Sequence, residues 1–373
     1  CLEMLVIRSP HARAAFSFGD LDAFAETFGV EAVLTAKDIP GRNVFGVIPQ
    51  FMDQPVFAEG ETRFRGEAVA AIIASPAVLE AFDPADFPVT WTELEAADDI
   101  EFAQGEKAAQ LHVGRDRNVM CGGFVTCGDP AAMLADAAVT VEGRFQSGFV
   151  EHAYIEPEAG FAQLVDGRVE VHACTQAPVM DLEGLEIILG MDRSQIRIVP
   201  TAVGGGFGSK LDISVQPCLA LGALKTGKPV RLCFSRSESM QSSTKRHPSD
   251  ITLKIGADKH GKLHGFDFKG DFDTGAYASW GPTVANRVPV HASGPYAIAD
   301  YRAESKGIHT NNPPAGAFRG FGVPQSAIAQ ECLFDELAAK LAMDPLDFRI
   351  LNTLENGTAT VCGQVFRQGV GIK

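Results

Sequence analysis

The 373-residue sequence lacks several features that would assign a function on their own. Its eight cysteines are scattered, with neither a C-x-x-C pair nor a C-x4-C-x2-C run, so we expect neither a zinc site nor an iron–sulfur cluster in this chain. It contains no H-E-x-x-H motif, and no apolar run approaches the roughly 20 residues that span a bilayer. The formal charge of −15 comes without a Lys/Arg-rich stripe, which argues against nucleic acid or a membrane as partner. An acidic chain with scattered thiols fits a reducing cytoplasm.

The length and the 46% apolar content allow two or three domains with real cores. The 38 glycines and 21 prolines indicate many turns and a mixed α/β fold. Short strand and helix patterns, including the apolar run 67–74, predict a small α/β domain over residues 1–100. Residues 101–128 contain Gly122-Gly123 and are predicted to be a linker. A larger domain follows over 129–373, with a hairpin around Asp166-Gly167 and a long amphipathic helix over 325–341.

The segment Val203–Lys210 (VGGGFGSK) is the most unusual in the chain, because four of its eight residues are glycine. A β-branched strand is predicted before it, over 196–200, and an apolar helix after it, over 211–224. Such a layout directs backbone N–H groups and a helix N-terminus at an anion or a cofactor. The segment matches neither phosphate-loop spacing, and a tight strand-to-helix connection is the alternative. The G-x4-G-K spacing at 256–262 lies between two alternating runs, which predicts a hairpin turn instead.

Three further segments are too unusual for ordinary scaffolding. The first joins EHAYIEP (151–157) to CTQAP (174–178), and the second is GDFDTGAYAS (270–279), which runs on to Asn286-Arg287. The third is TNNPPAGAFRGFGVPQ (310–325), which enters the long helix. In it Arg319 lies between two phenylalanines on a glycine-rich turn, an arrangement that suits a planar or anionic ligand.

The ordered set GGGFG, TQ-x-P and AFRGFG-x-PQ resembles the molybdopterin-binding large subunit of the xanthine dehydrogenase/aldehyde oxidase family of molybdenum hydroxylases. The resemblance runs from about Met4 to the C-terminus, and its look is that of bacterial nicotinate dehydrogenase and xanthine dehydrogenase. It implies a small hammerhead-like α/β domain followed by the first half of a molybdopterin-binding domain. It also implies a molybdenum–molybdopterin cofactor, in a pterin dinucleotide form, with no side-chain ligand to the metal.

The resemblance assigns roles to individual positions. Gln176 would hydrogen-bond an oxygen ligand near the metal and count as catalytic. The cofactor-binding set is Gln176, Gly206, Phe207, Gly208, Arg319 and Gly320, with Gly208 and Arg319 acting through their backbones. Phe321 would stack on a heteroaromatic ring, and Arg287 would bind a substrate oxygen or stabilise negative charge on that ring. Leu211 stands where xanthine dehydrogenases usually carry a purine-binding glutamate, which lowers the case for xanthine itself.

Each position also has a plain structural alternative. Gln176 could cap the helix predicted over 178–189, Phe207 could be a core residue, and Arg287 could form a surface ion pair. Taken singly, each alternative is at least as good as the functional reading; the ordered set shifts the balance.

The resemblance implies an enzyme that hydroxylates an electron-poor carbon of a purine- or nicotinate-type N-heterocycle, with water as the oxygen source. Electrons would pass to Fe–S and FAD partner subunits. The family's catalytic glutamate lies in a second half beyond residue 373, so a second polypeptide or a longer chain is expected. An aldehyde oxidoreductase and a non-catalytic structural or assembly subunit remain as alternatives.

Overall fold

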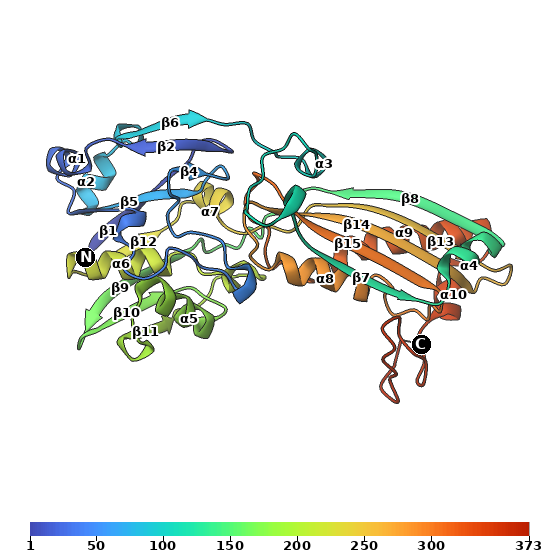
Figure 1. The fold of residues 1–373 in the computed structure, drawn as a ribbon. Helices are drawn as coiled ribbons and strands as arrows, with labels where there is room; N and C mark the ends of the chain where they lie inside the picture. Colours follow the sequence, from blue (N-terminus) through green and yellow to red (C-terminus); the bar gives the residue numbers. More distant parts are fainter. Residues whose placement is uncertain (373) are drawn as a thin grey trace.

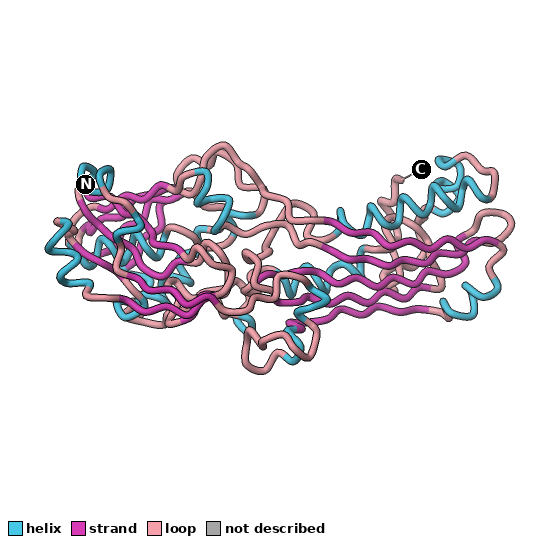
Figure 2. The backbone as a smooth tube through the Cα atoms, turned by 90° about the horizontal axis from the view of Figure 1, so that it is seen from above, coloured by secondary structure: helices cyan, strands magenta, loops and turns pink. Residues whose placement is uncertain are grey.

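The computed structural model describes residues 1–372 as an elongated molecule with a sheet-containing lobe at each end (Figure 1). One lobe holds a seven-stranded and a three-stranded sheet, and the other holds a five-stranded sheet. Seen from above, the long strands of the second lobe run along the length of the molecule (Figure 2). No helix among the described residues is long and apolar enough to cross a membrane.

The seven-stranded sheet draws its strands from two distant parts of the chain. Its spatial order is β11 (Ile196–Pro200), β10 (Arg168–Ala173), β9 (Ala159–Val165), β12 (Val230–Cys233), β1 (Leu2–Arg8), β5 (Ala68–Ala74) and β3 (Ala32–Leu34). The junction is the parallel pairing of β1 with β12, in which Leu2 lies opposite Val230. The first hundred residues therefore share a sheet with the larger segment, and the boundary near residue 100 stays a prediction.

Helices cover this sheet and close its core. They are α1 (Leu21–Phe28), α2 (Pro76–Ala81), α5 (Pro178–Leu189) and α6 (Gln216–Thr226). Asp20 caps α1 by accepting the N–H of Ala23 at 2.9 Å, as expected of an acidic residue at a helix start. Gly29 ends the helix in the left-handed region. Strand β5 is almost wholly buried between β1 and β3, which explains its continuous apolar run. The small sheet has the order β4 (Glu61–Thr62), β2 (Ala14–Phe18), β6 (Val89–Glu93).

The second lobe is one five-stranded sheet with helices against it. Its order is β7 (Val119–Cys127), β15 (Tyr301–His309), β14 (Leu263–Gly275), β13 (Ser249–Ala257) and β8 (Val139–Ser147). The helices are α3 (Ile100–Ala103), α4 (Pro130–Asp136), α8 (Gly281–His291), α9 (Val323–Lys340) and α10 (Pro345–Asn352); α7 (Arg236–Ser242) lies in the connection from the first lobe. The turn at 258–261 joins β13 to β14, so the hairpin prediction there is confirmed.

Two local predictions are wrong. Residues 119–127 are not a linker but strand β7, which pairs with β15. A Cβ on Gly123 would lie 2.9 Å from the Ala285 carbonyl of α8, so this glycine permits a close backbone approach within a sheet. The helix after the glycine loop begins at Gln216 rather than at residue 211, and a short 3₁₀ turn, Ser209–Leu211, comes first. Pro217 occupies its first turn, where a missing N–H costs nothing.

Candidate functional site

The glycine loop leaves β11 and turns back on itself without reaching a helix N-terminus. Phe207 has φ 52° and is 50% exposed, so the alternative that it is a core residue is wrong. Gly208 has φ 117°, and a Cβ there would lie 2.6 Å from the carbonyl oxygen of Ala317. Glycine is required at this position both by the positive φ and by the close approach of Ala317, the first residue of the AFRGFG segment.

Gln176 follows β10 and lies directly against the glycine loop. Its Oε1 accepts the N–H of Gly208 at 3.0 Å, and its own N–H donates to the Lys210 carbonyl at 2.8 Å. A Cβ on Gly206 would lie 2.3 Å from the same Oε1. The helix α5 has no side-chain cap, so Gln176 does not cap it. Oε1 accepts from Gly208 and Nε2 has no hydrogen-bond partner among residues 1–372, so the Nε2 amide group is the donor that this residue can offer to a ligand.

Lys210 joins the glycine loop to the EHAYIEP segment through its buried side chain. Its Nζ, almost fully buried, lies 2.7 Å from Glu156 Oε2, 3.0 Å from the Glu156 carbonyl and 4.5 Å from the centre of the Tyr154 ring. Glu156 Oε2 also accepts the N–H of Gly204 at 2.7 Å. The EHAYIEP segment therefore works as the support of the glycine loop, through a buried charge pair and a backbone contact.

The AFRGFG segment forms the second wall. The N–H of Arg319 donates to the Phe207 carbonyl at 2.9 Å, which joins the two glycine-rich loops directly. Gly320 (φ 99°), Phe321 (φ 47°) and Gly322 (φ 87°) are three consecutive residues in the left-handed region. Such a conformation is costly for phenylalanine and persists only where the surroundings fix it. The Arg319 side chain itself is exposed.

Phe321 and Arg287 meet beside this wall. The Arg287 guanidinium carbon lies 5.7 Å from the centre of the Phe321 ring, and the indole of Trp280 contacts the same ring edge-on at 5.7 Å. Arg287 is exposed on α8 and has no ion pair among residues 1–372, so the surface ion-pair alternative is not found. Trp280 was missed from the sequence, although it stands at the end of the GDFDTGAYAS motif.

Leu211 lies one 3₁₀ turn past Gly208, to whose carbonyl its N–H donates at 3.1 Å. It lines a cavity of about 120 Å³ together with Met180, Asp212 and Ser279. Burial raises the pKa of Asp212 to about 7, although the Ser279 hydroxyl donates to its Oδ2. Burial likewise raises the pKa of Asp181, on the same cavity wall, to about 6.

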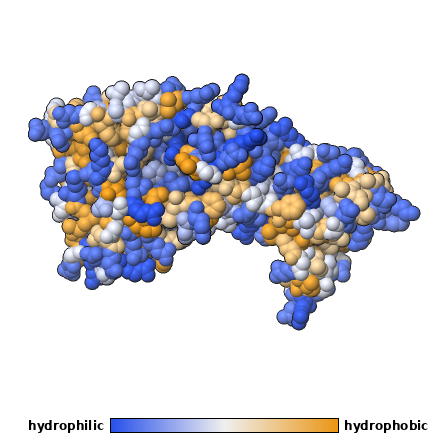
Figure 3. Space-filling model, in the orientation of Figure 1, coloured by the Kyte–Doolittle hydropathy of each residue, from blue (hydrophilic) through white to orange (hydrophobic). Residues whose placement is uncertain are grey.

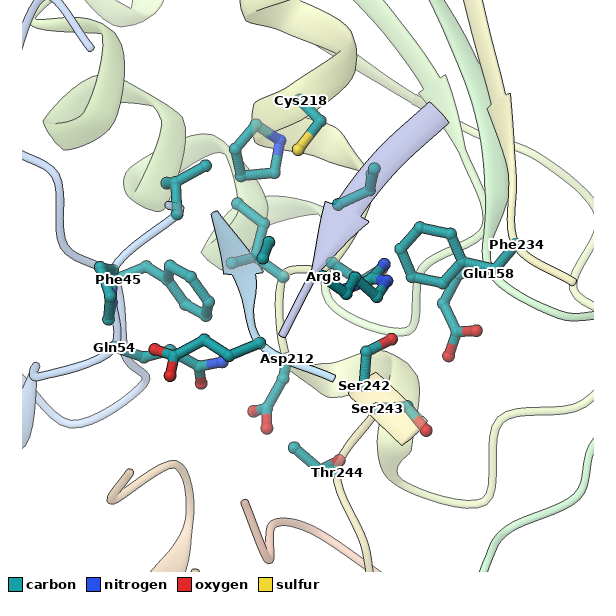
Figure 4. Close-up of a pocket in the computed structure, with 18 of the residues that line it drawn as sticks. Arg8, Phe45, Gln54, Glu158, Asp212, Cys218, Phe234, Ser242, Ser243 and Thr244 are labelled. Carbon is teal, nitrogen blue, oxygen red and sulfur yellow. The ribbon is translucent and has the colours of Figure 1, made fainter. Parts of the chain in front are cut away.

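A second cavity, of about 90 Å³, lies behind the glycine loop (Figure 4). Phe45, Gln54, Asp212 and Ile213 line both cavities. Arg8 lies in the centre of the second one, beside the Phe234 ring at 4.6 Å from its centroid and 3.7 Å from Glu238. Its lining mixes apolar and polar side chains, and it includes Ser209 and Lys210 of the loop.

Asp53, His112 and His309 come together although they are far apart in sequence, with ligand-type atoms within 4.8 Å of one another. The guanidinium of Arg115 occupies the space between them: its NH1 donates to Asp53 at 2.6 Å and contacts His309 Nε2. His309 Nδ1 bonds the Gly275 carbonyl at 2.9 Å. This buried cluster joins the 45–57 segment to the second lobe, and the arginine stands where a cation would have to be.

The outer face of the two loops suits a polar, oxygen-rich group. It presents the amide of Gln176 and two exposed arginines, Arg287 and Arg319. Donors of this kind fit the oxo groups and phosphates of a molybdopterin, and the site offers no protein ligand set for a bare metal ion.

Comparison with known proteins agrees with this geometry. The family model of the molybdopterin cofactor-binding domain matches residues 111–353, and that of the aldehyde oxidase and xanthine dehydrogenase a/b hammerhead domain matches residues 2–81. The chain belongs to the family of proteins that carry this molybdopterin cofactor-binding domain. It is therefore related to molybdenum-binding oxidoreductase subunits, and the mixed α/β fold expected from the sequence is confirmed.

Two curated relatives are 39% identical to the chain. One is the nicotinate dehydrogenase large molybdopterin subunit of Eubacterium barkeri, matched over 97% of this chain and 84% of that protein. The other is a probable xanthine dehydrogenase subunit of Bacillus subtilis, over 87% of this chain and 43% of that protein. Aldehyde oxidoreductase from Desulfovibrio gigas is a solved structure with TM-score 0.92 at 30% identity, over 98% of this chain and 41% of its own. The chain thus spans most of the first relative and less than half of the other two.

Proposed function

We propose that this chain is part of a molybdenum hydroxylase that oxidises an electron-poor carbon of a purine- or nicotinate-type N-heterocycle, with water as the oxygen source. The observation that carries the proposal is the Arg287–Phe321 pair beside the joined glycine-rich loops. An aromatic ring face next to an unpaired arginine suits a flat heterocycle that gains negative charge during reaction.

The cofactor would lie over the outer face of the two loops. Gly206, Phe207, Gly208, Arg319 and Gly320 supply backbone there, and Gln176 supplies an amide donor. The Gly208 N–H already donates to Gln176, so the direct donor toward the cofactor is the Gln176 Nε2 amide, which that bond orients. When bound, molybdopterin supplies the two-electron oxidation and the transfer of oxygen from water.

The substrate would lie between Phe321 and Leu211. Phe321 stacks on its ring, and Arg287 stabilises negative charge that develops on it, the kind of electrostatic help that is worth most in a site closed to water. Leu211 gives an apolar wall, which favours nicotinate-like or other heterocycles over xanthine.

Two alternatives agree less well with the site. An aldehyde oxidoreductase is supported by the likeness to the Desulfovibrio gigas structure and by the apolar Leu211, but it gives Arg287 no task. A non-catalytic structural or assembly subunit with this fold has no use for the free Gln176 amide.

We expect partners. A second half of the molybdopterin domain would bring the catalytic glutamate and would cover the apolar side chains Ile155 (92% exposed), Val179, Val203 and Phe207 beside the loops. On the face drawn in Figure 3, apolar residues form small patches among hydrophilic ones. Fe–S and FAD subunits would take the electrons. All eight cysteines are free thiols, four of them exposed, which supports a cytoplasmic location.

The test is molybdenum content by elemental analysis, on the complex purified from its native host with this chain as bait. Stoichiometric molybdenum with turnover of purines or nicotinate supports the proposal, and turnover of aldehydes alone favours the first alternative. An intact assembly without molybdenum removes the enzyme claim.

A further inference from the structure

Phe318 lies between Ala317, whose carbonyl approaches Gly208, and Arg319, whose N–H donates to Phe207. Two side chains pack against the faces of its ring. The His152 imidazole stacks on it with centroids 4.0 Å apart and planes 27° from parallel. The Arg246 guanidinium carbon lies 3.8 Å from the centre of the same ring. An arginine this close to an aromatic face is attracted by the ring quadrupole.

The same two residues bind the backbone on either side of Phe318. His152 Nε2 lies 2.8 Å from the Ala317 carbonyl, and Arg246 NH2 donates to the Arg319 carbonyl at 2.9 Å. Since a carbonyl oxygen only accepts hydrogen bonds, Nε2 must carry a proton, and in the neutral ring Nδ1 carries none. His152 is 6% exposed, and burial lowers its pKa to about 4, so this donor persists at neutral pH.

The segments that carry His152 and Arg246 are fastened to each other. Their neighbours Glu151 and Lys245 form a buried ion pair at 2.7 Å, and the Arg246 N–H donates to the Val150 carbonyl at 3.0 Å. Lys245 also exchanges backbone hydrogen bonds with the AFRGFG loop, to Pro314 at 3.0 Å and from Gly316 at 2.9 Å. The grip on Phe318 therefore has anchoring contacts of its own, in addition to those that join the EHAYIEP segment to the glycine loop.

The residues just after Phe318 form a strained turn whose position depends on these contacts. The strained turn at 320–322 begins one residue after Arg319, and it aims the Phe321 ring at Arg287. A left-handed phenylalanine is kept only if the backbone entering the turn is fixed. The Arg319 N–H, which bonds Phe207, belongs to the same fixed stretch.

We propose that His152 and Arg246 are positioning residues: they clamp Phe318 so that the 319–322 turn presents Phe321 to the substrate and holds Phe207 in place. In this role they act through Phe318 and the backbone beside it. The role in turnover rests on the proposed function, whereas the clamp itself is a property of this chain.

The experiment compares Arg246→Met, His152→Leu and the conservative pair Arg246→Lys and His152→Gln in the assembled complex. Arg246→Met keeps the length of the side chain but loses its charge and donors; His152→Gln keeps a donor for Ala317. Arg144→Met is the matched control, because Arg144 forms an exposed ion pair with Asp250 on the second lobe's sheet. Four quantities are measured: kcat, KM, molybdenum content, and hydrogen exchange of the amides at 317–322.

Arg246→Met and His152→Leu should lower kcat by roughly 10- to 100-fold, as a small misplacement of reacting groups does, with molybdenum content largely kept. Amide exchange at 317–322 should rise at least ~10-fold, and the conservative variants should recover part of both effects. Wild-type kcat and exchange in both variants would overturn the clamp. If the wild-type complex has neither molybdenum nor activity, the proposed function fails, and the exchange measurement alone decides the clamp.

Discussion

Replacing Lys210 by Met tests whether the glycine loop depends on the buried charge beneath it. Methionine keeps much of the apolar stem but leaves Glu156 without its cation. Breaking a buried pair costs about 3–5 kcal/mol. Glu156 is 30% exposed and keeps its bond from Gly204, so part of the cost is offset by water and by that N–H. We expect a loss of about 2 kcal/mol, or roughly 4 °C in melting temperature.

The assay is differential scanning calorimetry of the assembled complex at one fixed scan rate, because a protein with two lobes need not unfold in one step. The matched control is Lys225→Met, which removes an exposed pair with Asp38 and should cost at most about 1 kcal/mol. Adding Glu156→Gln to Lys210→Met should recover part of the loss, since it removes the unpaired charge. A Lys210→Met effect no larger than that of Lys225→Met would refute the reasoning.

Three further predictions concern the site. Gly208→Ala should lower the free energy of unfolding by at least ~2 kcal/mol and reduce molybdenum content. Gly227→Ala is the control, because Gly227 also has a positive φ but a Cβ there would have nothing within 4 Å; it should cost about 1 kcal/mol and leave the molybdenum content unchanged. Equal effects of the two variants in calorimetry and elemental analysis would contradict the close-approach argument. Arg287→Met should lower turnover roughly 100-fold with molybdenum unchanged, and parallel losses of both would disprove its electrostatic role. Asp212 has its pKa raised from 3.8 to about 7 in the folded chain, so the folded state holds a proton that the unfolded state releases, and stability falls as the pH rises from about 4 to about 7. Asp212→Asn should therefore raise the melting temperature more at pH 8 than at pH 5; a pH-independent difference would speak against a buried neutral carboxyl.

The loops of the site could be predicted from the sequence because their chemistry is local. Glycine at φ 117° and three successive left-handed residues around Phe321 leave a visible signature in composition. Helix α5 matched its prediction because Pro178 and Gly190 mark its two ends. The roles assigned to Gln176, Arg287 and Phe321 stay predictions, although the structure brings Gln176 to Gly208 and Arg287 to Phe321.

The missed features depend on contacts between distant segments. The sequence of strand β7 resembles that of a linker because Gly123 is explained only by the close packing of α8, more than 150 residues later. Helix α8 itself has Pro289 inside, a residue that disfavours a helix prediction. The grouping of Asp53, His112, Arg115 and His309, and the clamp of His152 and Arg246 on Phe318, have no spacing in the sequence that could reveal them.

The pairing of β1 with β12 has a consequence for synthesis on the ribosome. Strand β1 is made well before β12, so one of its edges waits for residues 230–233, more than 220 residues later. At about 5–20 residues per second, that edge stays unpaired for roughly 10 seconds or more. Its other neighbour, β5, emerges much sooner. A nascent chain that has not yet reached β12 thus carries an open apolar strand edge, the kind of surface that pairs with other chains and that chaperones cover.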